Sequence, residues 1–257
     1  MHNAAFAELG LNWRYLAFEV NPADLRAAIT GAKAMNFAGL NLTVPHKLLA
    51  VDMVDRLDES AKTWGAVNTI RFGPDGTTGF NTDADAIIRS VREELKLELT
   101  GAKVLLLGAG GASRTAALKL ASENMAELFL VNRTRAKAEE IAAEIKQRFP
   151  GVKVTTDYPS TSVDLIMNAT SLGLKPGDAS PLDETQFSPN RARAVYDMIY
   201  RPAETALLKS ARLAGCKTAN GLGMLLYQGA KAFEIWTGKP APIEIMRHAL
   251  KQNIYGH

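Results

Sequence analysis

The stretch Lys103–Ser113, with the sequence K-V-L-L-L-G-A-G-G-A-S, decides the fold of this chain. Its apolar start predicts a strand that is buried on both faces of a parallel sheet. The glycines that follow predict a tight turn, and residues 114–123, rich in Ala and Leu, predict a helix. In dinucleotide sites this order places backbone N–H groups of a helix N-terminus against the pyrophosphate. The motif alone is also compatible with an ordinary strand-to-helix turn.

The next predicted strand, residues 127–131, indicates which dinucleotide would bind. In an NAD site this strand ends in a carboxylate that binds the ribose 2′-hydroxyl. Here it is followed by N-R-T-R-A-K at residues 132–137, with three cations and no acid. A guanidinium binds a 2′-phosphate through charge-assisted hydrogen bonds, whereas positive charge at a helix start otherwise opposes the helix dipole. The sequence therefore predicts NADP as the cofactor, the alternative being a solvated basic helix start.

Composition narrows the class of protein. The chain has 257 residues and a net charge of +3, with 22% charged residues, so the charge does not favour nucleic acid as a partner. No apolar run reaches about 18 residues, so no membrane partner is expected. The four histidines are scattered and the single cysteine is Cys216, so we expect no metal site, no internal disulfide and a cytoplasmic location. The expected partner is a small-molecule substrate, and the expected assembly is a monomer or a homodimer.

The order of predicted elements indicates an α/β protein with two domains. We expect an N-terminal α/β substrate domain at residues 1–99, completed by C-terminal helices in 221–257. Residues 100–220 are expected to form a doubly wound, Rossmann-type NADP domain. Strands are predicted at 13–20, 39–44, 67–72, 77–80, 103–107, 127–131, 153–155, 164–168, 194–198 and 217–219. Helices are predicted over 21–35, 46–55, 83–95, 222–236 and 242–252.

A dehydrogenase also needs an acid or base at the substrate, and two pairs of residues are candidates for this role. Lys47 follows a predicted strand and Asp83 begins a predicted helix, both at breaks between elements where functional residues gather. For either residue alone, a surface lysine or a helix-capping aspartate is the simpler interpretation. Tyr227 and Lys231 have the Tyr-x-x-x-Lys spacing of short-chain dehydrogenases, but the glycine turn of that class opens the chain. The serine or threonine expected about thirteen residues before the tyrosine is Ala214 here.

A series of motifs resembles one family, the shikimate dehydrogenases, along nearly the whole chain. In the family's order the motifs are N-L-T-V-P-H-K at 41–47, G-A-V-N-T at 65–69, N-T-D at 81–83, G-A-G-G-A-S at 108–113, N-R-T at 132–134, N-A-T-S at 168–171 and G-L-G-M at 221–224 with Gln228. The resemblance implies reversible, NADP-dependent reduction of 3-dehydroshikimate to shikimate, in aromatic amino-acid and chorismate biosynthesis.

The resemblance also implies roles for individual residues. Lys47 and Asp83 would be the catalytic pair. The residues that would contact substrate are Thr43, Asn68, Tyr200 and Gln228. The residues that would hold NADP are Gly108, Gly110, Gly111, Ala112, Asn132, Arg133, Thr134 and Lys137, and those flanking the nicotinamide would be Thr170, Met198, Gly221 and Met224.

The sequence departs from the family pattern at three places. The family's first strand and its Ser-x-Ser segment, which binds the substrate carboxylate, have no counterpart before Met1, so we expect a truncation and weak or absent turnover. Ala84 replaces the glycine usual after N-T-D, and Asn220 replaces the aspartate usual before G-L-G-M. These differences leave two alternatives open: a quinate/shikimate dehydrogenase of broader specificity, and a non-catalytic NADP-binding protein.

Overall fold

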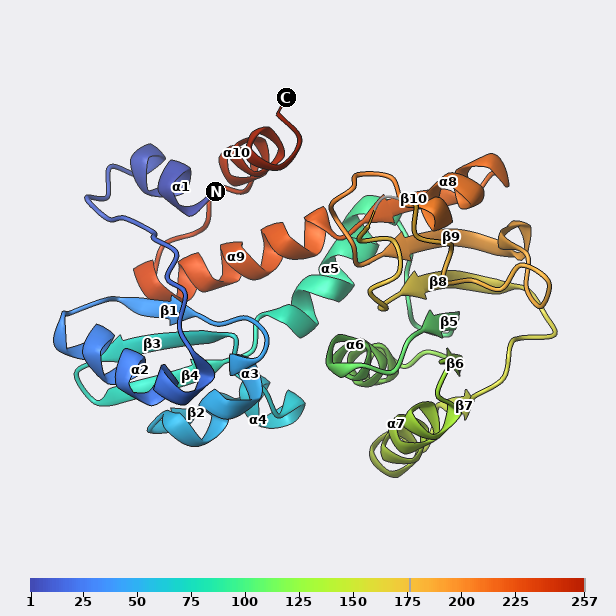
Figure 1. Ribbon diagram of the computed structural model, residues 1–257, viewed down its shortest axis with the longest axis horizontal. Coiled ribbons are helices and arrows are strands. Elements are labelled where there is room, and N and C mark those ends of the chain that lie inside the picture. Colours follow the sequence, from blue (N-terminus) through green and yellow to red (C-terminus); the bar gives the residue numbers. More distant parts are fainter. Residues whose placement is uncertain (176, 257) are drawn as a thin grey trace. The chain divides into compact units, whose positions relative to one another are not determined.

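The structure, a computed structural model, describes residues 1–175 and 177–256, which divide into two compact units (Figure 1). The first unit contains residues 1–86 and the chain from Leu226 onward, and the second contains Ile87–Leu225. The chain changes unit inside two helices, α5 (Asp83–Leu95) and α9 (Leu222–Thr237). The predicted domain boundaries, after residues 99 and 220, fall beside these helices rather than within them and stay predictions.

The second unit is built on a six-stranded sheet in which every pair of neighbouring strands is parallel. The strand order is β10-β9-β8-β5-β6-β7. Read from β7, with β5 counted as the first strand, this is the order 3-2-1-4-5-6 of nucleotide-binding folds. The predicted Rossmann-type fold is therefore confirmed. The strands are β5 (Lys103–Leu107), β6 (Glu127–Val131), β7 (Lys153–Thr155), β8 (Val163–Asn168), β9 (Ala192–Asp197) and β10 (Lys217–Asn220).

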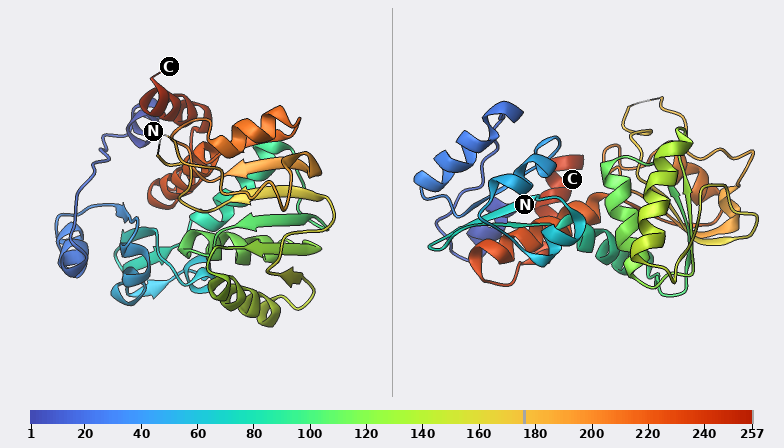
Figure 2. Two further views of the ribbon diagram at one scale, coloured as in Figure 1. Left: turned by 45° about the vertical axis from the view of Figure 1, so that its right-hand side comes forward. Right: turned by 90° about the horizontal axis from the view of Figure 1, so that it is seen from below.

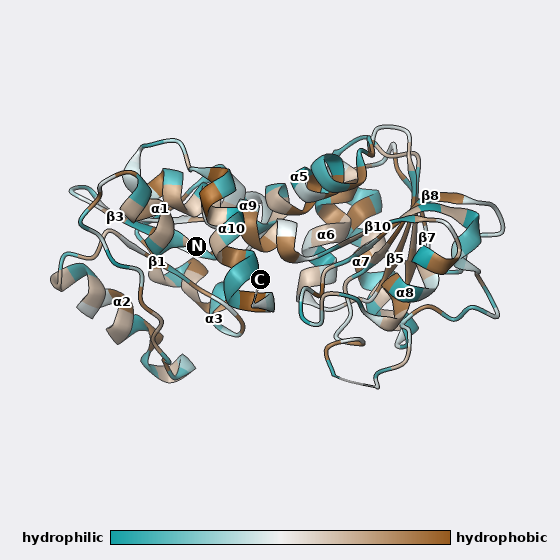
Figure 3. Cartoon of the chain, turned by 90° about the horizontal axis from the view of Figure 1, so that it is seen from above, coloured by the Kyte–Doolittle hydropathy of each residue, from teal (hydrophilic) through white to brown (hydrophobic). Residues whose placement is uncertain are grey.

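Helices cover both faces of this sheet, because the strands are apolar on both sides (Figure 3). Val195 of β9 packs on one face with α8 (Ala206–Leu213), whereas the adjacent Tyr196 points to the other face and donates a hydrogen bond to Ser90 of α5. The helices α6 (Gly111–Ser122) and α7 (Arg135–Arg148) lie side by side in Figure 2, and α6 contacts β5 and β6. A short 3-10 helix, η3 (Pro189–Arg191), precedes β9. Among the described residues, no helix has the length and apolar composition needed to cross a membrane.

The first unit contains a four-stranded sheet of mixed direction, with the order β1-β3-β4-β2. Strand β3 is antiparallel to β1 and β4, and β2 is parallel to β4, so β1, β2 and β4 all end at the same edge. Leu25 and Ile29 of α2 pack against Val67 and Ile70 to form the core on one face. The strands are β1 (Gly39–Asn41), β2 (Arg56–Leu57), β3 (Thr69–Gly73) and β4 (Gly76–Phe80).

The helices of the first unit are mostly short and connect these strands. The long ones are α2 (Leu25–Ala34) and α10 (Ile243–Tyr255), and α10 packs beside the N-terminal helix α1 (His2–Glu8). The predicted helix over 46–55 is divided into α3 (His46–Leu49) and the 3-10 helix η2 (Ala50–Met53). The two-residue strand β2, the helix α4 (Glu59–Trp64) and the 3-10 turn η1 (Pro22–Asp24), which opens α2, were not predicted from the sequence.

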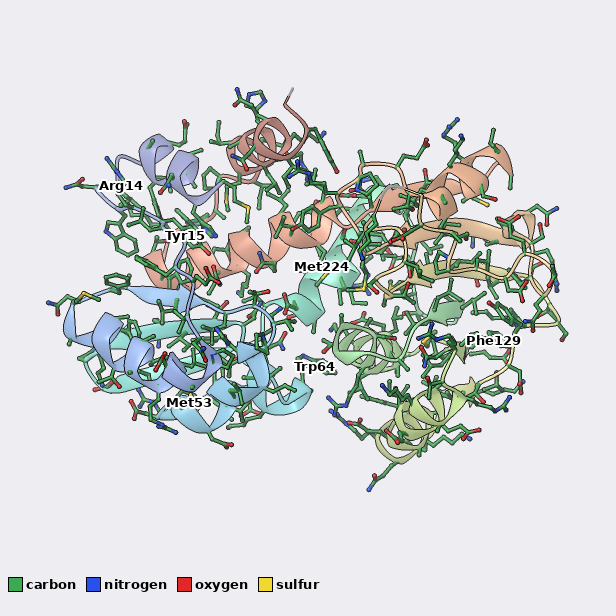
Figure 4. All side chains as sticks on the ribbon, viewed as in Figure 1. Arg14, Tyr15, Met53, Trp64, Phe129 and Met224 are labelled. Atoms are coloured by element: carbon green, nitrogen blue, oxygen red, sulfur yellow. The ribbon has the colours of Figure 1, made fainter. Side chains whose placement is uncertain are left out.

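The strand predicted at residues 13–20 is wrong, because this segment has no regular secondary structure. The N–H and carbonyl groups of Tyr15 (labelled in Figure 4) bond with the side chain of Asn3 instead of a neighbouring strand. The Tyr15 ring stacks on His2 with ring centroids 4.4 Å apart, and Leu16 and Phe18 are exposed. The alternation of large apolar residues thus reflects aromatic packing on one side of the segment rather than a sheet.

Candidate functional site

The catalytic pair predicted from the sequence is an ion pair in the first unit. Lys47 lies on α3, just after β1, and its Nζ atom is 2.7 Å from Oδ2 of Asp83 at the start of α5. The side chains are 28% and 14% exposed, so the pair is shielded enough to hold its geometry and open enough to contact a ligand. Both residues follow strands that end at the same edge of the sheet, which explains how two residues 36 positions apart in the sequence come together.

Asn81 holds Asp83 in this position, a role that the sequence analysis missed. Its Oδ1 accepts hydrogen bonds from the N–H groups of Asp83 and Ala84, so it satisfies the free donors at the start of α5. Its Nδ2 donates to the carbonyl of Ala66, and its backbone N–H donates to Oγ of Ser60. An Asn two residues before an acid at a helix start is a recognisable capping signal, and it was present in the N-T-D motif.

A second polar network occupies the same edge and contains Asn68. Asn68 is 2% exposed, and its Nδ2 donates to the hydroxyl of Thr82 while its Oδ1 accepts from the N–H of Thr82 and the hydroxyl of Thr69. Thr69 in turn accepts from Nδ2 of Asn41. This network fixes the start of β3 against the end of β4. The substrate-binding role of Asn68 stays a prediction, and Thr82 joins it as a residue that the sequence analysis did not select.

The other predicted substrate residues lie in three separate segments of the chain. Thr43 is exposed and its carbonyl accepts a hydrogen bond from the N–H of His46, which starts α3. Gln228 is half-buried on the part of α9 that belongs to the first unit. Tyr200 belongs to the second unit, follows β9 and is 38% exposed. Their contacts with substrate stay predictions.

The glycine turn of the second unit fits the pyrophosphate of a dinucleotide. Gly108 has φ +114°, and a Cβ atom there would lie 3.0–3.2 Å from Thr170 and Ala169. At Gly110 and Gly111 a Cβ atom would meet nothing within 4 Å, so no part of the described chain explains why these residues are small. A ligand that approaches the backbone closely does explain it. Ala112, in the first turn of α6, follows directly.

Three cations follow β6, but they are not equivalent. Arg135 forms ion pairs with Asp157 and Glu139, and hydrogen bonding to Asp157 raises the pKa of its guanidinium. Arg133 and Lys137 are exposed, and no ion pair within the described residues engages either of them. The side chain of Asn132 donates to the carbonyl of Thr134, which holds the turn, and the first turn of α7 contains no acid. Arg133 and Lys137 are therefore the cations available to a 2′-phosphate.

The ends of β8 and β9 are joined by a buried carboxylate, Asp197. Its oxygens accept hydrogen bonds from Nδ2 of Asn168, the N–H of Ile199 and the hydroxyl of Thr205. Burial raises the pKa of Asp197 above the usual range for a carboxyl group, although these hydrogen bonds oppose the shift. Oδ1 of Asn168 accepts hydrogen bonds from both the N–H and the hydroxyl of Thr170, and these two bonds fix the start of the loop after β8.

The remaining residues predicted to flank the nicotinamide lie near this carboxylate. A Cβ atom at Gly221 would lie 2.0 Å from the carbonyl of Met198, so the absence of a side chain lets the start of α9 approach the end of β9. The N–H of Met198 donates to the carbonyl of Asn168, and Met224 (labelled in Figure 4) is half-buried in the first turn of α9. The structure thus groups Thr170, Met198, Gly221 and the glycine turn at the carboxyl ends of β5, β8 and β9. The fit to NADP rests on the open glycines and on the two unpaired cations.

Comparison with known protein families gives matches along most of the chain. Residues 1–70 match the shikimate dehydrogenase substrate binding domain. Residues 90–173 match the family described as shikimate / quinate 5-dehydrogenase, and residues 221–251 match the shikimate 5′-dehydrogenase C-terminal domain. The three matches follow the order of the motifs in the sequence.

Individual relatives agree with these matches. The shikimate dehydrogenase (NADP(+)) of Methanopyrus kandleri is 42% identical, over 99% of this chain and 90% of the relative. A crystal structure of a shikimate dehydrogenase in complex with NADP+ has a TM-score of 0.89 and 39% identity, covering 98% of this chain and 89% of that one. The ligand-free 5-ketofructose reductase of a Gluconobacter strain has a TM-score of 0.87 and 35% identity, covering 98% and 91%.

Proposed function

The chain belongs to the shikimate dehydrogenase family, and we propose that it catalyses the reversible, NADP-dependent reduction of 3-dehydroshikimate to shikimate. The observation that carries the proposal is the ion pair of Lys47 and Asp83, with 2.7 Å between Nζ and Oδ2. A ketone that becomes a secondary alcohol gains a hydride at carbon and a proton at oxygen. Reduced NADP supplies the hydride, so the protein has to supply the proton.

Lys47 is the residue that we assign to this proton transfer. In the reductive direction its ammonium group donates a proton to the carbonyl oxygen, and in the oxidative direction the amine takes the proton from the alcohol. Asp83 orients the Nζ atom and stabilises its positive charge. Asn81, through its bonds to the first turn of α5, keeps the carboxylate in place. A charge pair of this kind can act on a secondary alcohol without a bound metal ion.

The residues around the pair would bind the ring hydroxyls. We propose that Thr43, Asn68, Tyr200 and Gln228, with Thr82 added from the structure, donate and accept hydrogen bonds to substrate. A site that pairs each hydroxyl rejects analogues that lack one, because its own polar groups are then left without partners. On the cofactor side we assign the pyrophosphate to the glycine turn at residues 108–112. The 2′-phosphate falls to Arg133 and Lys137, beside Asn132 and Thr134.

A second candidate function comes from the similarity to a 5-ketofructose reductase, which shows that the fold of this family also serves in a reductase whose name denotes a different ketone. Quinate is a third possible substrate, since a matching family is described as shikimate / quinate 5-dehydrogenase. We therefore propose shikimate as the preferred substrate rather than the exclusive one. With one cysteine in the whole sequence, we further propose a reducing, cytoplasmic location, and assembly as a monomer or homodimer.

The test is a comparison of substrates with the purified chain. Formation of reduced nicotinamide is followed at about 340 nm with shikimate or quinate, and its consumption is followed with 5-ketofructose, each with NADP and with NAD. We expect the highest kcat/KM for shikimate with NADP. Because the comparison ranks substrates, slow turnover does not obscure it. A higher kcat/KM for another substrate, or for NAD, contradicts the proposal, and tight NADP binding without turnover of any substrate favours a non-catalytic role.

A further inference from the structure

A pocket of about 340 Å³ lies at the hairpin end of the first unit's sheet, away from the residues assigned above. It is lined by Arg56, Arg71, Thr78 and the hairpin residues 72–76. Strand β4 runs about 13 Å from this hairpin to Phe80. The hairpin and its pocket therefore lie at one end of the strand, and Asp83 follows the other end. A water molecule occupies about 30 Å³ in the liquid, and the pocket therefore has room for a small organic molecule.

The strand register places the three polar side chains in one row. Arg56 of β2 and Arg71 of β3 are both paired with Thr78 of the strand between them, β4. Residues that pair across a sheet point to the same face, and here that face is opposite to the core residues Leu57 and Ile70. Neighbouring strands are about 4.8 Å apart, so the two arginines start about 10 Å apart with a hydroxyl group between them.

Within the described residues no ion pair engages Arg56 or Arg71, whereas Arg114, Arg135 and Arg148 each have an acidic partner. The guanidinium of Arg71 lies over the ring of Phe80, 5.7 Å from its centroid, which orients it without cancelling its charge.

Two acids lie near these arginines. Asp75 lines the pocket and offsets one of the two positive charges. Asp55, next to Arg56 in the sequence, accepts hydrogen bonds from the N–H and hydroxyl of Thr77, and these bonds, together with the charges of Lys33 and Arg56, hold its pKa below the usual carboxyl range. The residues that line the pocket carry a net charge of +1, with two positive groups on the same face. Asp55 is not one of them and forms an ion pair with Lys33. An anion between them would remove their mutual repulsion.

We propose that this pocket binds a phosphate dianion, either inorganic phosphate or the phosphate of a small monoester. Arg56 and Arg71 would each donate a forked pair of hydrogen bonds to its oxygens, and the hydroxyl of Thr78 would donate a further one. The room beyond a bare phosphate accommodates the organic part of a monoester. This site is separate from the 2′-phosphate site at Arg133 and does not depend on the reaction that the enzyme catalyses.

The test is a titration of the full-length protein followed by NMR at constant ionic strength. Inorganic phosphate and glycerol 3-phosphate are the two ligands, with chloride as the balancing anion. We expect saturable shifts of the backbone amides at residues 73–78 and of the Nε–H groups of Arg56 and Arg71. Stronger binding of glycerol 3-phosphate identifies a monoester site, and equal binding identifies a site for phosphate itself. Shifts that appear only near Arg133, or no saturation at the hairpin, overturn the proposal.

Four variants show whether the row of side chains is responsible. Arg56→Gln and Arg71→Gln should each weaken binding about tenfold or more, since a charge-assisted hydrogen bond is lost. Asp75→Asn should tighten binding, because it removes the one carboxylate from the lining. Arg14→Gln is the matched control: it removes the same charge from an exposed position of the same unit and should leave binding unchanged. If Arg14→Gln and Arg71→Gln weaken phosphate binding equally, phosphate is attracted to the basic surface in general. That result would refute a specific site at the hairpin.

Discussion

The six-stranded sheet of the second unit and the four-stranded sheet of the first unit present different kinds of groups at the sites that we propose. At the carboxyl ends of β5, β8 and β9, the second unit offers mainly backbone: the glycine turn, the start of α6 and loops that Asn168 and Asp197 hold in place. At the corresponding edge of its own sheet, the first unit offers side chains, above all Lys47 and Asp83. Binding by backbone tolerates most substitutions, whereas a charge pair fails when one member is removed. Substitutions in the two units should therefore affect different measurements.

Among the substitutions that leave Lys47 in place, Asp83→Asn should have the largest effect. The amide keeps the shape of the carboxylate but removes the charge that orients Nζ of Lys47, so proton transfer should suffer. We expect kcat to fall about 100-fold or more, with little change in the Kd for NADP. Steady-state kinetics with shikimate and a separate NADP titration give both values. Asp85→Asn, which removes the same charge from the same turn of α5, is the control and should keep most of the activity. A parallel loss in Asp85→Asn would contradict a specific role for Asp83.

Acid should destabilise the first unit through His2. This side chain is 4% exposed, and burial, followed by the charge of the amino terminus, lowers its pKa to about 4 from 6.5. Between these pH values the unfolded chain binds a proton that the folded chain does not, so the free energy of unfolding falls as pH falls from 6.5 to 4. The expected loss is up to about 3 kcal/mol.

Denaturant unfolding at several pH values, with probes in each unit, measures this loss. His2→Gln removes the titrating group, so its unfolding free energy should depend less on pH in this range. The second unit should show no matching change, which would sharpen the contrast between the units. An identical pH dependence in His2→Gln and in the parent protein would rule out His2 as the source.

Arg133→Gln should weaken the binding of NADP without weakening the binding of NAD. The arginine is exposed and free of ion pairs in the described chain, and a charge-assisted hydrogen bond to a 2′-phosphate contributes about 1.5–3 kcal/mol. We therefore expect KM for NADP to rise about tenfold or more while KM for NAD stays the same. Arg135→Gln is the matched control, because Arg135 is already paired with Asp157 and Glu139. A larger effect at Arg135 would mean that the ion pairs open when the cofactor binds.

Gly110→Ala should have a smaller effect, which is confined to NADP binding and leaves stability unchanged. Its φ of −86° suits alanine, and a Cβ atom there meets nothing in the described chain, so stability should not fall. The methyl group should reach the space assigned to the pyrophosphate and raise the Kd for NADP several-fold. Gly108→Ala provides the contrast: its φ of +114° and its contact with Ala169 predict a loss of about 1 kcal/mol or more in stability. Unchanged NADP binding in Gly110→Ala would remove the argument from the open glycines.

The two units also differ in how much of them the sequence predicted. Strands β5 and β6 begin and end at the predicted residues, because a buried parallel strand is a short apolar run bounded by turn residues. The short outer strand β7 also has its predicted bounds. In the first unit β1 and β2 have three residues and two residues. Such strands carry little pattern of their own and exist because longer neighbours pair with them. Residues 13–20 show the converse case, in which a strand-like pattern has no partner.

The candidate site shows a similar limit. Lys47 and Asp83 could be selected from motifs, and the structure brings their side chains into contact. The residues that hold them, such as Asn81 and Ser60, act through hydrogen bonds between segments about 20 positions apart in the sequence. Nothing in local composition specifies that Oγ of Ser60 accepts from the N–H of Asn81. The buried contact of Asn168 with Asp197 is equally remote from any local pattern, since it joins two strands across 29 positions.

Lys47→Ala tests most directly whether the first unit performs proton transfer and the second unit holds NADP, when turnover and NADP affinity are measured on the same sample. We predict that kcat with shikimate falls by about 100- to 10,000-fold while the Kd for NADP is unchanged. Lys62→Ala, an exposed lysine paired with Glu59 in the same unit, should leave both values near those of the parent protein. Retention of kcat in Lys47→Ala, or a loss of NADP binding as large as the loss of turnover, would contradict the account.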